Sequence, residues 1–158
     1  MTTAPALTGR DIGEAENAIR ALLDRQLEEA GLTFPEWTVL FTLDGAGPLP
    51  RGELVRRQVH GLKVSEAAAR ATVDGLRSSG LIAPVDQAGD AGGSLGEGED
   101  PRLTPTADGQ ARYRPVRQAV VRIADELYGD LPPADLEATR RTLAEVTRRA
   151  NARLAAGG

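Results

Sequence analysis

The sequence predicts a mostly α-helical protein with one small β-hairpin. Three observations lead to this fold class. Apolar residues recur every three or four positions over several long segments, as in amphipathic helices. Two short strand-like stretches flank a segment rich in glycine and acidic residues, which is typical of a hairpin. With 158 residues, the chain is long enough to bury a core, and we expect it to form one domain.

The composition narrows the possible functions. The formal net charge is −4, there is one histidine, and there is no cysteine. Without cysteine, the chain has no disulfide, no thiolate zinc site and no redox-active thiol. The sequence contains no apolar run long enough to span a membrane, and its first residues do not resemble a signal peptide. We therefore expect a cytoplasmic protein without a membrane partner.

A long helix is predicted near the N-terminus. Residues 1–10 are expected to be a flexible tail and residues 11–31 a helix that ends at Gly31. Its apolar stripe consists of Ile12, Ala15, Ile19, Leu22, Leu23 and Leu27. Such a stripe packs either against a second subunit or within its own chain, and both possibilities remain open at this point.

The next helix has a well-marked beginning. Thr33 is expected to cap it and Glu36 to complete a capping box, while Leu32 and Trp37 form a hydrophobic staple. Residues 44–48, with the sequence DGAGP, are predicted to end this helix. We interpret Trp37 as a core anchor, with a place in a ligand pocket as the alternative.

Residues 51–82 are interpreted as two helices joined by a tight turn. The first covers residues 51–59, and Gly61 is expected to close it in the left-handed conformation. Ser65 is expected to cap the second helix and Gly80 to end it. This is the pattern of a helix-turn-helix, whose second helix lies in the major groove of DNA. The alternative is a plain pair of amphipathic helices with a solvated charged face.

The exposed face of the second helix has the features of a DNA-reading surface. Small side chains near its start allow close approach to base edges, and cations can reach guanine or phosphates. The small residues are Ser65, Ala67 and Ala68, and the cations are Lys63, Arg70 and Arg77. Residues 51–80 contain six basic and three acidic side chains, so their charge is +3. A local basic surface is therefore compatible with the negative net charge.

A hairpin, or wing, is predicted after the helical pair. Its strands lie near residues 81–85 and 102–104, and a glycine-rich segment connects them. From Asp86 to Arg102 there are five acidic residues and one arginine, which gives this segment a charge of −4.

Two long helices are predicted after the hairpin. Thr104 is expected to cap the first, with Pro105 at its first helical position and Gly129 at its end. The second begins at Pro132-Pro133, and its apolar stripe consists of Leu136, Leu143, Val146, Ala150 and Leu154.

In the order of these elements, the chain resembles the MarR family of winged helix-turn-helix transcription regulators. The matching stretches are residues 32–40 (LTFPEWTVL), 64–76, 80–82 and 103–109. The resemblance implies a winged helix-turn-helix lobe between dimerisation helices. The lobe would cover residues 32–104 with a wing at about 82–104, the N-terminal dimerisation helix residues 11–31, and the C-terminal dimerisation helices residues 105–155.

The resemblance also implies a function. Such proteins are homodimers that bind pseudo-palindromic double-stranded operators, often as repressors that a small aromatic or phenolic ligand releases. By position, the groove-facing residues would be Ser65, Ala67, Ala68, Arg70 and Ala71, and the phosphate-binding residues would be Lys63 and Arg77. Trp37, Phe41 and His60 would border the ligand pocket.

The wing departs from the family pattern. The family usually has a basic cluster here that contacts DNA, whereas this chain has acidic residues and one cation, Arg102. By alignment, Arg102 would make the wing's contact with DNA. Because phosphates repel such a wing, the alternative function is a dimeric ligand-binding or protein-interaction module that binds DNA weakly or not at all. No catalytic, metal-binding or cofactor motif is present, so we expect neither an enzyme nor a cofactor.

Overall fold

The computed structural model describes residues 7–85 and 101–157. The chain divides into two compact units, residues 1–120 and 121–158. Helices make up most of the described residues, and three short strands form a sheet in the first unit. The predicted fold class, mostly helical with a small β element, is confirmed.

The first unit begins with two helices, α1 (Gly9–Ala30) and α2 (Phe34–Ala46), each capped by a threonine. The predicted capping box is confirmed at α2. The Thr33 N–H donates to Glu36 Oε2 at 2.8 Å, and the Glu36 N–H donates to Thr33 Oγ1 at 3.4 Å. Thr8 and Asp11 form the same box at α1, so this helix begins at Gly9 instead of residue 11.

The helix α2 ends inside the segment that was predicted to end it. Residues 44–46 remain helical, and the chain leaves the helix only at Gly47, whose φ is +76°. The Gly47 N–H still donates to the Leu43 carbonyl at 2.9 Å. Gly45 lies inside the last turn and does not have a positive φ, so it is Gly47 that adopts the conformation for which glycine is favoured.

The helical pair consists of α3 (Arg51–Leu62) and α4 (Glu66–Ser78). Ser65 caps α4 as predicted, since its Oγ accepts the Ala68 N–H at 3.2 Å. Gly80, with φ +73°, follows the end of α4, as predicted. The prediction for α3 is wrong: Gly61 stays inside the helix, and Lys63 adopts the left-handed conformation with φ +56°.

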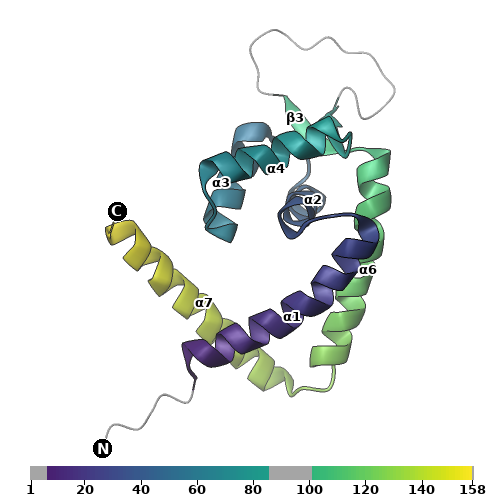
Figure 1. The fold of residues 1–158 in the computed structure, drawn as a ribbon. Coiled ribbons are helices and arrows are strands. Elements are labelled where there is room, and N and C mark those ends of the chain that lie inside the picture. The colour runs from purple at the N-terminus through teal and green to yellow at the C-terminus, as the bar shows by residue number, and fades with distance from the viewer. Residues whose placement is uncertain (1–6, 86–100, 158) are drawn as a thin grey trace, which may run out of the picture. The chain divides into compact units, whose positions relative to one another are not determined.

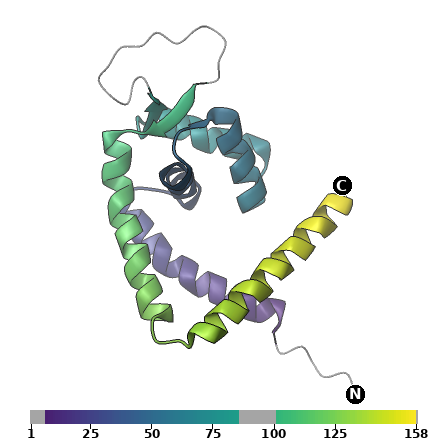
Figure 2. The same cartoon turned by 180° about the vertical axis from the view of Figure 1, so that it is seen from behind.

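The sheet contains the predicted hairpin and one further strand. β2 (Ile82–Pro84) pairs antiparallel with β3 (Arg102–Pro105). A strand that the sequence did not predict, β1 (Leu49–Pro50), pairs with the other edge of β3, so the order is β1-β3-β2. The view in Figure 2 shows this sheet beside the helical pair. The acidic part of the predicted wing, residues 86–100, lies outside the described residues.

The helix α6 (Ala107–Tyr128) begins later than predicted. Thr104 and Pro105 belong to β3, so the predicted cap at Thr104 is wrong. Thr106 takes that role: its Oγ1 accepts the Gly109 N–H at 3.1 Å and donates to the Gly80 carbonyl at 2.6 Å. The start of α6 is thereby joined to the end of α4.

The core of the first unit surrounds α2, which packs against α1, α3 and α4. Figure 1 shows α2 nearly end-on beside the helical pair. The buried residues are Leu27, Leu32, Val39, Leu40, Leu43, Leu54, Val55, Ala69, Val73, Leu76, Leu81, Ile82, Leu103, Tyr113 and Val116. The helical pair is therefore part of a winged helix-turn-helix lobe and not an isolated hairpin of two helices.

The second unit contains the end of α6 and α7 (Pro133–Ala156), which begins where the sequence predicted. No residue of α7 is buried. Several large apolar side chains of this unit are exposed: Val121, Leu127, Tyr128, Leu131, Leu143, Val146 and Leu154. In the part of the chain that the structure describes, no helix is both long and apolar enough to cross a bilayer.

Candidate nucleic-acid interface

The candidate interface is the exposed face of α4 with the residues that flank it. Ala69, Val73 and Leu76 point into the core, and this burial fixes which side of α4 meets solvent. All eight residues predicted to bind DNA are exposed: Lys63, Ser65, Ala67, Ala68, Arg70, Ala71, Arg77 and Arg102. Seven of them lie on α4 or in the turn before it, and Arg102 lies on β3. Their contacts with DNA stay a prediction.

The shape of this face suits close approach to base edges. Between Ser65 and Ala71, the exposed side chains are Ser65, three alanines, Glu66 and Arg70. Only Glu66 and Arg70 extend beyond a short side chain, so the backbone of α4 can approach another surface closely. A recognition helix reads bases with the residues near its N-terminus, which is where these residues lie.

Ion pairs organise the cations around α4. Arg51 forms a bidentate pair with Asp74, with Nε to Oδ1 at 2.8 Å and Nη2 to Oδ2 at 2.6 Å. Hydrogen bonding from Arg51 is the main cause that lowers the pKa of Asp74 below its usual value. This pair joins the start of α3 to the middle of α4. Sequence reasoning missed it because the partners lie 23 positions apart.

Two further carboxylates bind arginines of their own helices. Glu53 on α3 accepts hydrogen bonds from Arg57 and Arg56, which lower the pKa of Glu53. Glu66 on α4 accepts two hydrogen bonds from Arg70, one of them from Nε at 2.9 Å. These pairs are exposed and contribute little to stability, but they reduce the positive charge that the arginines present.

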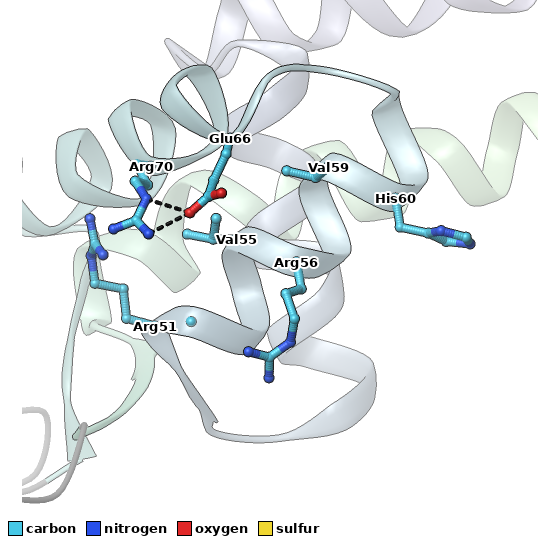
Figure 3. A pocket seen from close by; sticks show the side chains of 8 residues that line it. Arg51, Val55, Arg56, Val59, His60, Glu66 and Arg70 are labelled. Carbon is cyan, nitrogen blue, oxygen red and sulfur yellow. Dashed lines mark hydrogen bonds and ion pairs between the residues drawn. The ribbon is translucent and has the colours of Figure 1, made fainter. Parts of the chain in front are cut away.

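A cavity of about 460 Å³ lies between α3 and α4. Its lining combines cations with an apolar pair and consists of Arg51, Gly52, Val55, Arg56, Val59, His60, Glu66 and Arg70. Figure 3 shows Arg70 and Glu66 facing each other and His60 pointing away from them. The predicted base-reading arginine therefore borders a hollow in the surface.

Arg102, which is predicted to contact DNA, also makes a hydrogen bond within the chain. Its Nη1 donates to the Pro48 carbonyl at 3.1 Å, which joins β3 to the segment before β1. Despite this hydrogen bond, Arg102 is exposed to solvent. Arg102 is therefore held at the base of the wing.

The three predicted pocket residues do not lie in one place. Trp37 and Phe41 are neighbours on α2, with ring centroids 5.4 Å apart, whereas His60 lines the cavity between α3 and α4. Phe41 is 54% exposed and His60 is also exposed, so neither side chain points into the core. Trp37 is half-buried and packs against the core, as its interpretation as an anchor requires.

The aromatic row on α2 includes residues that sequence reasoning missed. Phe34 lies 5.8 Å from Trp37 between ring centroids, and the Arg20 guanidinium of α1 lies 3.4 Å from the centre of the Phe34 ring. The Trp37 Nε1 is buried without a hydrogen-bond partner among the described residues. The spacing of Phe34, Trp37 and Phe41 at three and four positions could have revealed this row, but the approach of Arg20 depends on tertiary packing.

Comparison with solved structures identifies the fold. The transcriptional regulator PA3341 gives a TM-score of 0.70 at 17% identity, covering 90% of this chain and 97% of that chain. BpsR of Bordetella bronchiseptica, whose DNA binding is regulated by 6-hydroxynicotinic acid, gives 0.65 at 19% identity, with coverages of 93% and 97%. The MarR family protein Rv2887 of Mycobacterium tuberculosis, in complex with salicylic acid, gives 0.61 at 22% identity, with coverages of 92% and 98%.

These neighbours cover nearly the whole chain, including both units. The sequence matches no family model and no curated protein. The chain has the winged helix-turn-helix fold of MarR-family transcriptional regulators. The winged helix-turn-helix fold predicted from the sequence is therefore confirmed.

Proposed function

We propose that this chain is a sequence-specific, double-stranded-DNA-binding transcriptional regulator of the MarR type, acting in the cytoplasm as a repressor that a small aromatic ligand releases. One observation carries the proposal. The outer face of α4 combines small exposed side chains with flanking cations, at the place where a winged helix-turn-helix lobe meets the major groove. In this role Ser65, Ala67, Ala68, Arg70 and Ala71 face the groove, and Lys63 and Arg77 bind phosphates.

The assembly we propose is a homodimer on a pseudo-palindromic operator. The apolar side chains of α7 and the end of α6 are exposed in the single chain, and such a surface is typical of an interface with a second copy. Residues 11–31 and 105–155 would supply the dimerisation helices, and residues 32–104 the DNA-binding lobe. Two lobes related by a twofold axis read two half-sites about one helical turn apart.

The ligand we propose is an aromatic molecule, as in the neighbours that bind salicylic acid and respond to 6-hydroxynicotinic acid. Trp37 and Phe41 remain the candidate pocket residues, with Arg20 as a nearby cation. His60 remains a separate candidate beside the DNA-binding face. Because the neighbours are described as regulators, this function is favoured over an enzyme.

The alternative is a ligand-binding or protein-interaction module of the same fold that binds DNA weakly or not at all. The net charge of −4 and the acidic composition of residues 86–102 favour it. It predicts no retention on a polyanion column at low salt, whereas the regulator is retained through its local basic surface.

The test is fluorescence anisotropy of the protein with duplexes that flank its own coding region, with a random duplex as the control. The regulator predicts saturable binding that weakens as salt rises, with a logarithmic slope of about −0.9 for each phosphate neutralised. It also predicts weaker binding to the random duplex. Failure to bind either duplex at low salt would favour the alternative, and equal binding to both would exclude sequence-specific recognition of the flanking DNA.

A further inference from the structure

Glu66 is a carboxylate at a place where a DNA-binding surface should avoid negative charge. It lies in the first turn of α4, and its side chain is 63% exposed. Phosphates repel such a group whatever the DNA sequence. Glu66 and Arg70 are also the only long exposed side chains between Ser65 and Ala71. The two residues are therefore best considered as one unit.

The geometry of the ion pair leaves part of Arg70 available. The Nε and Nη2 atoms of Arg70 both donate to Oε1 of Glu66. A guanidinium has five N–H groups in a planar fork, so this pair leaves the edge formed by Nη1 and the second N–H of Nη2 unused. That edge can donate two parallel hydrogen bonds to O6 and N7 of guanine. Glu66 thus holds one edge of Arg70 while the other edge can face a base.

We propose that Glu66 is a positioning residue for base recognition by Arg70, and that the pair selects guanine at one position of each half-site. This inference rests on the proposed DNA-binding function. A free arginine loses much rotational freedom when it binds a base, and an arginine already held in place loses less. The carboxylate also weakens binding to every sequence by repulsion. Together these effects widen the difference between the correct site and other DNA.

The chain offers a matched control for the charge effect. Glu53 is a second carboxylate of the same lobe and also binds arginines of its own helix, but these are Arg56 and Arg57. Neutralising Glu53 removes the same charge and leaves the pair of Glu66 with Arg70 intact. A change in base preference in the Glu66 variants alone can then be assigned to the positioning of Arg70.

The experiment begins with selection of duplexes from a random pool by the wild-type protein. Binding of the variants Glu66→Ala, Glu66→Gln, Arg70→Ala and Glu53→Gln is then measured on the selected duplex. The same measurements are made on duplexes that carry each other base at the preferred guanine and on random DNA. Circular dichroism of each variant confirms that the helices are intact.

We expect Glu66→Ala to lose about tenfold in its preference for guanine and to bind random DNA more tightly than the wild type. Glu66→Gln should keep most of the preference, because its amide oxygen still accepts from Arg70, while it also binds random DNA more tightly. Arg70→Ala should lose the preference without gaining affinity for random DNA. Glu53→Gln should keep the full preference of the wild type.

Two results would overturn the proposal, and they differ in what else they exclude. If the wild type prefers guanine and Glu66→Ala keeps that preference, Glu66 does not position Arg70, although the proposed regulator stands. If the wild type selects no sequence and binds no DNA, the proposed function fails together with this inference.

Discussion

Gly109 of α6 occupies a position that no other residue fits. A Cβ atom built there would lie 2.0 Å from the Leu81 carbonyl oxygen. The close approach is between the backbones of Gly109 and Leu81. The Leu81 oxygen also accepts a hydrogen bond from the Thr106 N–H at 3.0 Å. The junction of α4, β2 and α6 therefore depends on the absence of a side chain at this residue.

We predict that Gly109→Ala lowers the free energy of unfolding by about 1–3 kcal/mol, because α6 or the Leu81 backbone must move. Gly75→Ala in α4 is the matched control. A Cβ at Gly75 has no atom within 4 Å, so alanine there should raise stability by about 0.5–1 kcal/mol. Urea denaturation of both variants measures the effect. A Gly109→Ala protein as stable as the wild type would show that the close approach is not needed.

Prediction from sequence fails most often for the conformation of individual residues. The sequence favours Gly61 as the left-handed residue after α3, because glycine adopts that conformation at the lowest cost. Lys63 adopts it instead, since α3 continues to Leu62 before the chain turns toward the Ser65 cap. Composition indicates that a turn lies here, but the packing of α3 against α4 decides which residue forms it.

Among the helices of the first unit, α2 and α6 are joined by polar side chains. The Tyr113 hydroxyl donates to Asp44 Oδ2 at 3.1 Å, and Arg117 Nε lies 3.3 Å from the same oxygen. The Tyr113 side chain is itself buried. Burial, with a smaller contribution from the hydrogen bond to Asp44, raises the pKa of Tyr113 to about 12.

This contact predicts a loss of stability at high pH. Because the folded-state pKa of Tyr113 is raised, its contribution is fully present below the ordinary value of 10.0 and is lost as pH rises toward about 12. Tyr128→Phe leaves Tyr113 as the single tyrosine, so ultraviolet absorbance of tyrosinate reports Tyr113 directly. We expect its ionisation to occur well above 10.0, and ionisation close to 10.0 would contradict a buried, hydrogen-bonded phenol.

Most elements could be predicted because their signals are local. The box of Thr33 and Glu36, the Ser65 cap and the spacing of buried residues in α4 each lie within a few positions of one another. The two-residue strand β1 has no such signal, since only its pairing with β3 makes it a strand. For the candidate site, exposure of the α4 face follows from periodicity, whereas the pair of Arg51 with Asp74 depends on tertiary structure.

At the scale of the whole molecule, the two units differ in how they use apolar residues. The first unit buries its apolar side chains around α2, while α7 buries none. An amphipathic helix gains most of its stability from the packing of its apolar face. The exposed stripe of α7 is therefore the strongest reason, within the described residues, to expect a second copy of the chain.

Charge is unevenly distributed along the chain. A net charge of −4 limits non-specific attraction to DNA, while residues 51–80 have a charge of +3. Several of these cations are already paired with carboxylates, as Arg70 is with Glu66 and Arg51 with Asp74. On this account the protein binds random DNA weakly and depends on base contacts for its affinity.

Sedimentation velocity tests whether this chain is a dimeric, DNA-binding regulator. The protein is examined alone and with a fluorescent duplex taken from the DNA that flanks its coding region. We expect the free protein to sediment as a dimer and two chains to move with each duplex. A random duplex of the same length should remain free at the same salt concentration. A monomer that leaves both duplexes unbound would contradict the claim that this chain is a dimeric, DNA-binding regulator.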